Sequence, residues 1–335
     1  MTVKEIVQQL TEMYGPSGSE SQIRALIAQM IDTYVDETRT DALGNLIAVK
    51  RATTTQSAGT LMLAAHMDEI GVVVSYIDEK GFCRFHGVGG VPVQNLIGGR
   101  VLFENGTTGV IGEEKFSSGK LPPMEKLYID VGATSRDDAP VRVGDFAGFY
   151  RPFVDQGTRW IAKSMDDRIG CAILIQMLKE LEETAYDIYA VFTSQEEVGT
   201  RGAVVSAFGI DPDIGIAIDV TATGDTPECR KMDVKLGDGA AIKVKDGGMI
   251  AHPGLRRHLV ETALAADIPY QLEVLEWGST DARSIQIARA GIPAGTISIP
   301  CRYVHTPSEM VDAGDVRAAV DLLLQVVRKP INLAS

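Results

Sequence analysis

The segment YAVFTSQEEVGTRG, at residues 189–202, passes from apolar to acidic within a few positions. Its first half, residues 189–194, is typical of a buried β-strand, and Glu196 and Glu197 follow just before a glycine-containing turn. The end of a buried strand is an unfavourable place for two adjacent carboxylates unless a cation compensates their charge. The segment therefore predicts a strand of an α/β sheet with a candidate site at its carboxyl end, although a solvated turn would also fit.

Acidic and histidine residues occupy comparable positions elsewhere in the chain. His66 ends the apolar run at residues 60–65, and Asp219 ends the apolar segment IGIAID. His305 follows the strand-like segment TISIP, and Asp166 stands just before an apolar, helix-like segment. Each residue alone has an ordinary explanation, such as a helix cap for Asp166 or a loop position for His305. Together they predict one site, because ligands in an open α/β sheet gather beyond the carboxyl ends of its strands.

Strands and amphipathic helices alternate in the N-terminal and C-terminal parts of the chain. Apolar residues recur at helical spacing from Ile23 to Ile31 and again from Val316 to Val327. Further helices are expected at residues 174–181, 255–266 and 281–290, and strands at 46–49, 60–65, 188–193, 214–218, 271–275 and 294–299. This alternation predicts an α/β domain.

Residues 70–159 have a different pattern. Short β-type runs such as FCRFHGV, RVLFE and LYIDVGA are separated by Gly, Asp and Asn, with no amphipathic helix between them. This pattern predicts a small all-β module, and a closed barrel would fit it. We therefore expect an α/β catalytic domain at residues 1–69 and 160–335, interrupted in sequence by a β-barrel domain at 70–159.

The composition is that of an ordinary globular protein, with 45% hydrophobic and 23% charged residues in a chain of 335. The net charge of −13 gives no electrostatic basis for binding nucleic acid or an anionic membrane. The N-terminal sequence MTVKEIVQQL lacks the apolar stretch of a signal peptide, and no apolar run is long enough to span a bilayer. Because the four cysteines are widely spaced, they fit a reduced compartment, and we expect a cytoplasmic protein.

The six candidate residues form a chemically complete set for a dinuclear metal site. Two imidazoles and three carboxylates can bind two divalent ions, and zinc and cobalt suit such mixed ligands. Two neighbouring ions polarise a carbonyl and lower the pKa of a water, while a spare glutamate can move that water's proton to a leaving amine. Asp68, two residues after His66, can hold the second imidazole nitrogen and fix its tautomer. The set thus predicts metal-assisted hydrolysis.

Eight segments of the chain resemble, in the same order, the motifs of the tetrahedral aminopeptidase family. These segments are GPSGSE, LGNL, HMDEIG, DDRIGC, SQEEVGTRGA, AIDV, GSTDA and IPCRYVHTPSEM, and the resemblance extends from about residue 14 to the C-terminus. Members of this family are dinuclear-metal exopeptidases that are variously labelled glutamyl aminopeptidase, deblocking aminopeptidase, cellulase or endoglucanase.

The resemblance implies how the metal ligands are divided. It implies that Asp166 bridges two divalent ions, which we expect to be Zn²⁺ or Co²⁺. His66 and Asp219 would complete one metal site. Glu197 and His305 would complete the other.

The resemblance also implies roles for the remaining site residues and for the fold. Glu196 would be the general base, Asp68 would orient His66, and the peptide bond between Asp166 and Asp167 would be cis. The implied fold is a mixed-sheet, three-layer α/β domain of the zinc-exopeptidase type with an inserted β-barrel that serves as a dimerisation domain. The substrates would be short peptides, and dimers would assemble into a tetrahedral homo-dodecamer.

Several other interpretations stay open at the level of sequence. A related dinuclear-metal deacylase or carboxypeptidase would use the same ligands, and a non-catalytic, metal-stabilised oligomerisation module would not need Glu196. A glucanase fits less well, because classical acid/base carboxylates have a sugar between them and Glu196 and Glu197 are adjacent in sequence. Arg302 could meet an acidic substrate side chain, but a structural ion pair is the more common role for a loop arginine. The preferred N-terminal residue is not readable.

Overall fold

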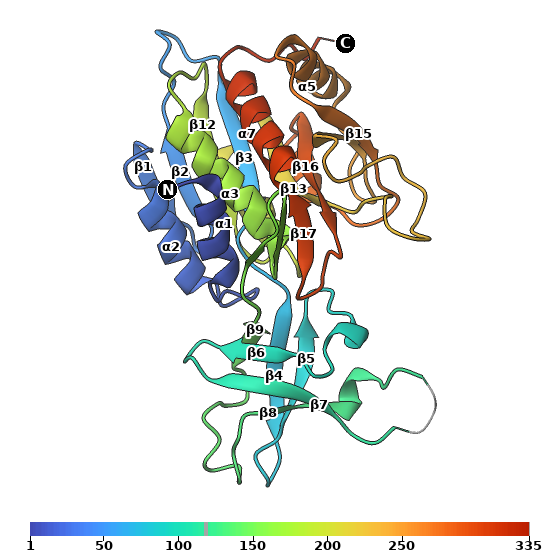
Figure 1. Ribbon diagram of the computed structural model, residues 1–335. Helices are drawn as coiled ribbons and strands as arrows, with labels where there is room; N and C mark the ends of the chain where they lie inside the picture. The colour runs from blue at the N-terminus through green and yellow to red at the C-terminus, as the bar shows by residue number, and fades with distance from the viewer. Residues whose placement is uncertain (117–119, 335) are drawn as a thin grey trace.

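The computed structural model describes residues 1–116 and 120–334. It has a mixed α/β part, in which helices cover both faces of a large sheet, and a closed antiparallel barrel that lies below this sheet in Figure 1. This arrangement confirms the predicted fold class.

The large sheet mixes parallel and antiparallel strands. Its strands follow the spatial order β1-β2-β12-β3-β13-β16-β17-β11-β10, and β14 and β15 branch from β16. Their bounds are β1 Glu37–Thr40, β2 Leu46–Lys50, β3 Thr60–His66, β10 Val154–Asp155, β11 Arg159–Ala162, β12 Asp187–Thr193, β13 Ile214–Thr221, β14 Ala240–Lys245, β15 Tyr270–Val274, β16 Ala294–Arg302 and β17 Glu309–Asp312.

Four parallel neighbours form the centre of the sheet. Strands β12, β3, β13 and β16 pair in parallel, so their carboxyl ends lie at the same edge. Nearly every side chain of these strands is buried, which explains why their sequences are continuous apolar runs rather than alternating ones. The register places Thr193 opposite His66, so β12 and β3 end together.

Within residues 1–116 and 120–334, seven α-helices cover the two faces of the sheet. Helices α1 Val3–Glu12, α2 Ser21–Ile31, α3 Met165–Glu180, α5 Pro253–Ala265 and α7 Ala313–Val327 contribute to one core, and α4 Arg201–Ile210 and α6 Asp281–Gln286 contribute to the core on the opposite face. Helix α1 begins with a capping box between Thr2 and Glu5, which satisfies amides at its N-terminus. The result is a three-layer arrangement.

The barrel lies between β3 and β11 in the chain. Its strands close in the order β4-β5-β8-β7-β6-β9 around an apolar core of their own. Their bounds are β4 Gly71–Ile77, β5 Cys83–Val88, β6 Arg100–Phe103, β7 Thr108–Glu113, β8 Leu127–Asp130 and β9 Phe146–Phe149, with short 3₁₀ turns η1 Val93–Asn95 and η2 Met124–Lys126. The chain leaves β3 at His66, enters the barrel at Gly71 and returns to the large sheet at β10.

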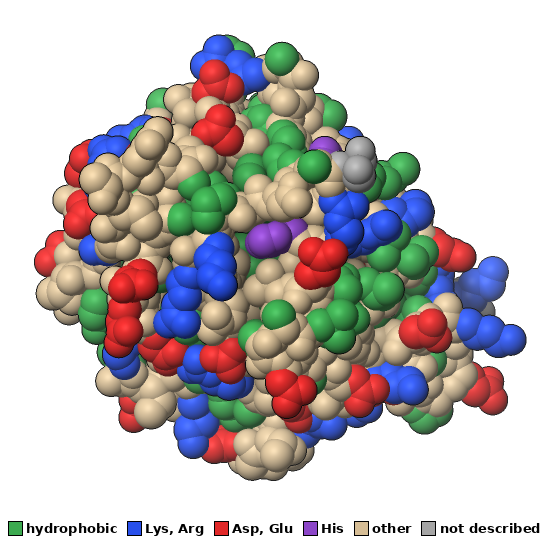
Figure 2. Space-filling view, turned by 90° about the horizontal axis from the view of Figure 1, so that it is seen from above, with side chains coloured by type: hydrophobic (Ala, Val, Ile, Leu, Met, Phe, Trp, Pro, Cys, Tyr) green, Lys and Arg blue, Asp and Glu red, His purple; other side chains and the backbone are tan. Residues whose placement is uncertain are grey.

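The termini and the outer surface follow from this arrangement. The N-terminus lies beside α1 and the C-terminus beside α5, both on the α/β part (Figure 1). On the face shown in Figure 2, acidic and basic side chains are interspersed, with apolar patches between them. Within residues 1–116 and 120–334, no helix is long and apolar enough to cross a bilayer.

Candidate metal centre

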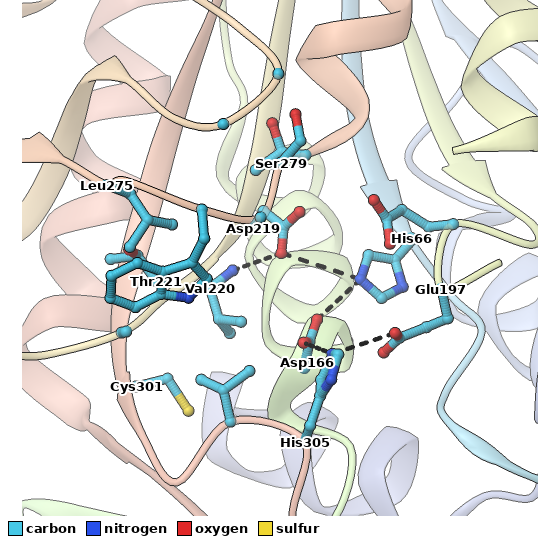
Figure 3. A pocket seen from close by; sticks show the side chains of 18 of the residues that line it. His66, Asp166, Glu197, Asp219, Val220, Thr221, Leu275, Ser279, Cys301 and His305 are labelled. Atoms are coloured by element: carbon cyan, nitrogen blue, oxygen red, sulfur yellow. Dashed lines mark hydrogen bonds and ion pairs between the residues drawn. The ribbon is translucent and has the colours of Figure 1, made fainter. Parts of the chain in front are cut away.

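The carboxyl edge of the central strands brings the predicted site residues together. His66 is the last residue of β3, Asp219 lies near the end of β13, and Glu197 follows β12. His305 lies in the loop after β16, and Asp166 lies at the start of α3. Figure 3 shows these five side chains converging from five segments of the chain. The Asp166–Asp167 peptide bond is cis.

Among the residues that the structure describes, two groups of three side chains could each hold a metal ion, and they share Asp166. In the first group, His66 Nε2 lies 2.9 Å from Asp166 Oδ1 and 4.0 Å from Asp219 Oδ1. In the second, His305 Nε2 lies 3.3 Å from Asp166 Oδ2 and 3.2 Å from Glu197 Oε2. Each oxygen of the Asp166 carboxylate therefore faces one group, which is the geometry that a bridging carboxylate needs.

The other ring nitrogen of each histidine faces a backbone carbonyl. His66 Nδ1 lies 3.2 Å from the carbonyl oxygen of Asp68, and His305 Nδ1 lies 3.0 Å from that of Gly90. A carbonyl can only accept, so each Nδ1 carries a proton, and a metal-bound ring would be the Nδ1–H form with Nε2 as the ligand atom. This is the tautomer that a metal-binding imidazole requires.

The loop after β5 lies directly against the site. A Cβ atom at Gly90 would lie 2.8 Å from His305 Nδ1, and one at Gly89 would lie 3.1 Å from the Cβ of Glu197. Gly89 also has a φ of +79°, a conformation that residues with a side chain rarely adopt. Two glycines therefore allow this barrel loop to touch both side chains.

Asp68 contacts more of the site than His66 alone. Its buried carboxylate has Oδ1 3.5 Å from His66 Nδ1 and accepts hydrogen bonds from the amides of Glu196 and Glu197 at 3.0 and 3.3 Å. The Ser17 hydroxyl donates to it at 2.5 Å. One carboxylate therefore connects the end of β3, the turn after β12 and the loop after α1.

Glu196 belongs to neither of the two groups, and its side chain borders the cavity in front of them. Burial raises the pKa of its carboxyl well above the ordinary value. His66 opposes this rise, whereas Asp219 and other nearby carboxylates add to it. A carboxyl group with a raised pKa at a cavity wall is suited to accept and return a proton.

Buried negative charge is concentrated around Asp166. Burial raises the pKa values of the Asp219 and Glu197 carboxyls, and Asp166 raises them further. Burial lowers the pKa of the His305 imidazole, but hydrogen bonds to Asp166 and Glu197 outweigh it and raise that pKa to about 12. Glu197 Oε1 is buried and has no hydrogen-bond partner among the described residues. These residues fit divalent cations, because buried carboxylates need positive charge and imidazole plus carboxylate is a ligand set of zinc and cobalt.

Two buried acids at the site escaped the sequence-based prediction. Glu309 is 2% exposed and accepts hydrogen bonds from the amides of Asp166 and His305. Asp281 accepts a hydrogen bond of 2.5 Å from the Thr193 hydroxyl at the end of β12, and burial raises its pKa to about 6. The segments GSTDA and IPCRYVHTPSEM contain these acids, but nothing in their spacing separates a buried acid from a solvated one.

The cavity in front of the two groups has a volume of about 850 Å³. The apolar side chains of Val220, Leu275 and Trp277 form part of its wall. Arg302 also lines it, but Asp225 accepts hydrogen bonds from its Nε at 3.0 Å and its Nη2 at 2.6 Å. Arg302 is therefore engaged in a structural ion pair.

Known proteins resemble this chain over most of its length. The family model of the M42 glutamyl aminopeptidases matches residues 44–322. The lysyl aminopeptidase of Pyrococcus furiosus is 37% identical over 95% of this chain and 94% of its own length. Among solved structures, the aminopeptidase APDkam598 of the archaeon Desulfurococcus kamchatkensis has a TM-score of 0.94 and 39% identity, and the alignment covers 98% of this chain and 94% of that one.

A further solved relative is known for its assembly. The TET1 peptidase of Pyrococcus horikoshii, which can assemble into a tetrahedron or a large octahedral shell, has a TM-score of 0.87 and 31% identity, with 98% of this chain and all of that chain covered. The family match spans most of the chain and includes every residue of the candidate metal centre. The protein therefore belongs to the M42 glutamyl aminopeptidase family and is a peptidase of the aminopeptidase class.

Proposed function

We propose that the protein is a two-metal aminopeptidase that removes single residues from the N-termini of short peptides. One observation carries this proposal: two three-residue groups share Asp166, and Glu196 remains outside both of them at the cavity wall. The first group, His66, Asp166 and Asp219, would hold one ion, and the second, Asp166, Glu197 and His305, would hold the other.

The side chains of the chain would divide the work of hydrolysis. Divalent ions bound there would polarise the scissile carbonyl and make water a better nucleophile at neutral pH. Glu196 would accept a proton from the attacking water and deliver it to the amine of the leaving peptide. Asp68 would hold the His66 ring through Nδ1 and place Glu196 through its backbone amide.

The proposal is tested with aminoacyl-anilides before and after treatment with a chelator. We expect hydrolysis to stop when the metal is removed and to return with Zn²⁺ or Co²⁺. Glu196→Gln should keep both ions but lose turnover by about 10²- to 10⁴-fold, because only proton transfer is removed. Glu114→Gln is the control, because Glu114 pairs with Arg84 and Lys126 in the barrel. Full activity of the metal-free protein would refute the proposal.

Other substrates and measurements distinguish the alternative functions. A deacylase would cleave N-acylated amino acids in preference to free aminoacyl-anilides, and a carboxypeptidase would release residues from the other end of a peptide. A non-catalytic module would turn over no peptide, while metal would still raise its melting temperature. Release of reducing sugar from a glucan by metal-free protein would favour a glucanase.

We also propose that the barrel within the predicted segment 70–159 is a dimerisation domain inserted into a catalytic domain of residues 1–69 and 160–335, and that dimers assemble into a homo-dodecamer. Residues 154–159, with β10 and the start of β11, belong to the large sheet, so the inserted domain ends before them. The barrel has an apolar core of its own, and large side chains such as Tyr76, Val110 and Val143 are exposed on it. Light scattering measures the assembly. A monomer at micromolar concentration, with and without metal, would contradict it.

A further inference from the structure

The loop that carries His305 is fixed less directly than the strands that carry His66 and Asp219. His66 and Asp219 lie within β3 and β13, where parallel pairing with Thr193 and Ser298 sets their positions. His305 lies between β16 and β17, and its φ of +63° is uncommon for a residue with a side chain. A backbone conformation of this kind persists only where neighbouring groups hold it.

Glu309 is the buried group that holds this loop. Its Oε1 accepts a hydrogen bond of 2.7 Å from the amide of His305, and its Oε2 accepts one of 3.0 Å from the amide of Asp166. Both oxygens are therefore engaged, and the side chain is 2% exposed. Glu309 itself is placed by β17, in which it is registered against Ala162 of β11.

We propose that Glu309 is a positioning residue for the group formed by Asp166, Glu197 and His305. Its two hydrogen bonds connect the backbones of Asp166 and His305, so they set the distance between two of the three side chains in that group. Glu309 donates no atom to an ion or to substrate. This inference rests on the proposed metal site and goes beyond it. Strands β3 and β13 would hold His66 and Asp219 in place, whereas Glu309 would hold the loop of His305.

The two halves should therefore respond differently to a change at Glu309. Glu309→Gln replaces one acceptor oxygen with an amide NH₂, which cannot accept a hydrogen bond from a backbone amide. The group containing His305 would lose its geometry, while His66 and Asp219 would keep theirs through the sheet. Glu309→Asp keeps the charge but is one methylene shorter, so it can reach only one of the two amides.

Metal binding to the wild type and to Glu309→Gln and Glu309→Asp, measured by calorimetry and by the absorption spectrum of Co²⁺-loaded protein, tests the inference. We expect the ion at Asp166, Glu197 and His305 to bind about 10- to 100-fold more weakly. The ion at the other group, which shares only Asp166 with it, should be weakened less. Two ions bound with wild-type affinities and an unchanged Co²⁺ spectrum in either folded variant would overturn it. Equal weakening of both ions would overturn it as well.

Asp315→Asn is the matched control. Asp315 is fully buried, and its two oxygens accept hydrogen bonds of 2.8 Å from the amides of Gly237 and Gly239. This variant should lose thermal stability as Glu309→Gln does but should keep both metal affinities. If the wild type itself binds fewer than two ions, the proposed two-metal function is wrong. If the wild type binds two ions and the Glu309 variants bind them equally well, only the positioning role of Glu309 is wrong.

Discussion

At the scale of single residues, the Asp68 carboxylate organises the turn that carries Glu196 and Glu197. It is fully buried and accepts hydrogen bonds from both of their amides and from the Ser17 hydroxyl. Hydrogen bonds to a charged group in a buried place each contribute about 1.5–3 kcal/mol. The hydrogen bond from the Ser17 hydroxyl should therefore fix the orientation of the Asp68 carboxylate. This orientation in turn places the backbone amides of Glu196 and Glu197.

Ser17→Ala is expected to lower kcat/KM by about 10- to 100-fold, as the loss of an outer partner commonly does at metal sites. The Asp68 oxygen that faces Ser17 would keep only the longer bond of 3.3 Å from the Glu197 amide. Steady-state kinetics with saturating metal measure the loss. Ser206→Ala is the control, because the buried Ser206 hydroxyl bonds only to carbonyls of its own helix. Equal activity of the two variants would contradict a positioning role for Ser17.

At the scale of elements, the barrel loop after β5 takes part in the site through its backbone. The Gly90 carbonyl accepts a hydrogen bond from His305 Nδ1, and the absence of a side chain permits this approach. The barrel and the strand edge are thus joined at a histidine that we expect to bind metal.

Gly90→Ala is expected to displace the His305 ring, because the added Cβ would lie 2.8 Å from Nδ1 and 3.0 Å from Cε1. Metal affinity should fall about 10- to 100-fold, and activity should fall with it at limiting metal. Gly209→Ala is the control, since a Cβ at that position of α4 meets nothing within 4 Å. Titration with Zn²⁺ while anilide hydrolysis is followed measures the shift. An unchanged titration curve for Gly90→Ala would rule out tight contact at this loop.

The strand ends could be predicted from sequence because buried parallel strands are continuous apolar runs. His66 and Asp219 stand at the ends of such runs. Burying a polar group there costs free energy unless a hydrogen-bond partner or an ion compensates it. The elements that escaped prediction lack this signal. Strand β1 has the sequence ETRT and is exposed throughout, β17 has only four residues, and β14 contains Lys243, which is buried beside Glu273 at 2.5 Å.

The contacts that complete the site could not be predicted for a different reason. Gly90 contributes a carbonyl oxygen, which every residue has, so no residue type marks its role. Glu309 resembles any acid in a loop until its two amide partners are known, and these are separated by more than a hundred positions in sequence. Local patterns specify strands and their ends, whereas such long-range contacts depend on the tertiary arrangement.

At the scale of the whole molecule, metal binding and folding should be coupled. The candidate ligands come from β3, β13, α3 and the segments after β12 and β16, so they are assembled only in the folded state. An ion that binds the folded state alone stabilises it by about 2.7 kcal/mol at a free concentration 100-fold above its Kd. The dependence of this gain on pH follows from the ionisable groups of the site.

The melting temperatures of metal-stripped and metal-loaded protein should diverge as the pH rises. In the stripped protein, burial raises the pKa values of Glu196, Glu197 and Asp219 above those of the unfolded chain. Hydrogen bonds to carboxylates outweigh burial and also raise the pKa of His305. Groups with raised pKa values bind more protons when folded, so their contribution to stability is lost as the pH rises. For the three carboxyls the loss begins above about pH 4, where the unfolded carboxyls ionise. For His305 the loss begins above about pH 6.5 and continues toward its folded pKa of about 12. Ion binding requires deprotonated ligands, so the stability gained from metal grows over the same range.

Thermal unfolding of both forms from pH 5 to pH 8 measures the difference between their melting temperatures. Parallel curves would show that these groups do not bind the metal.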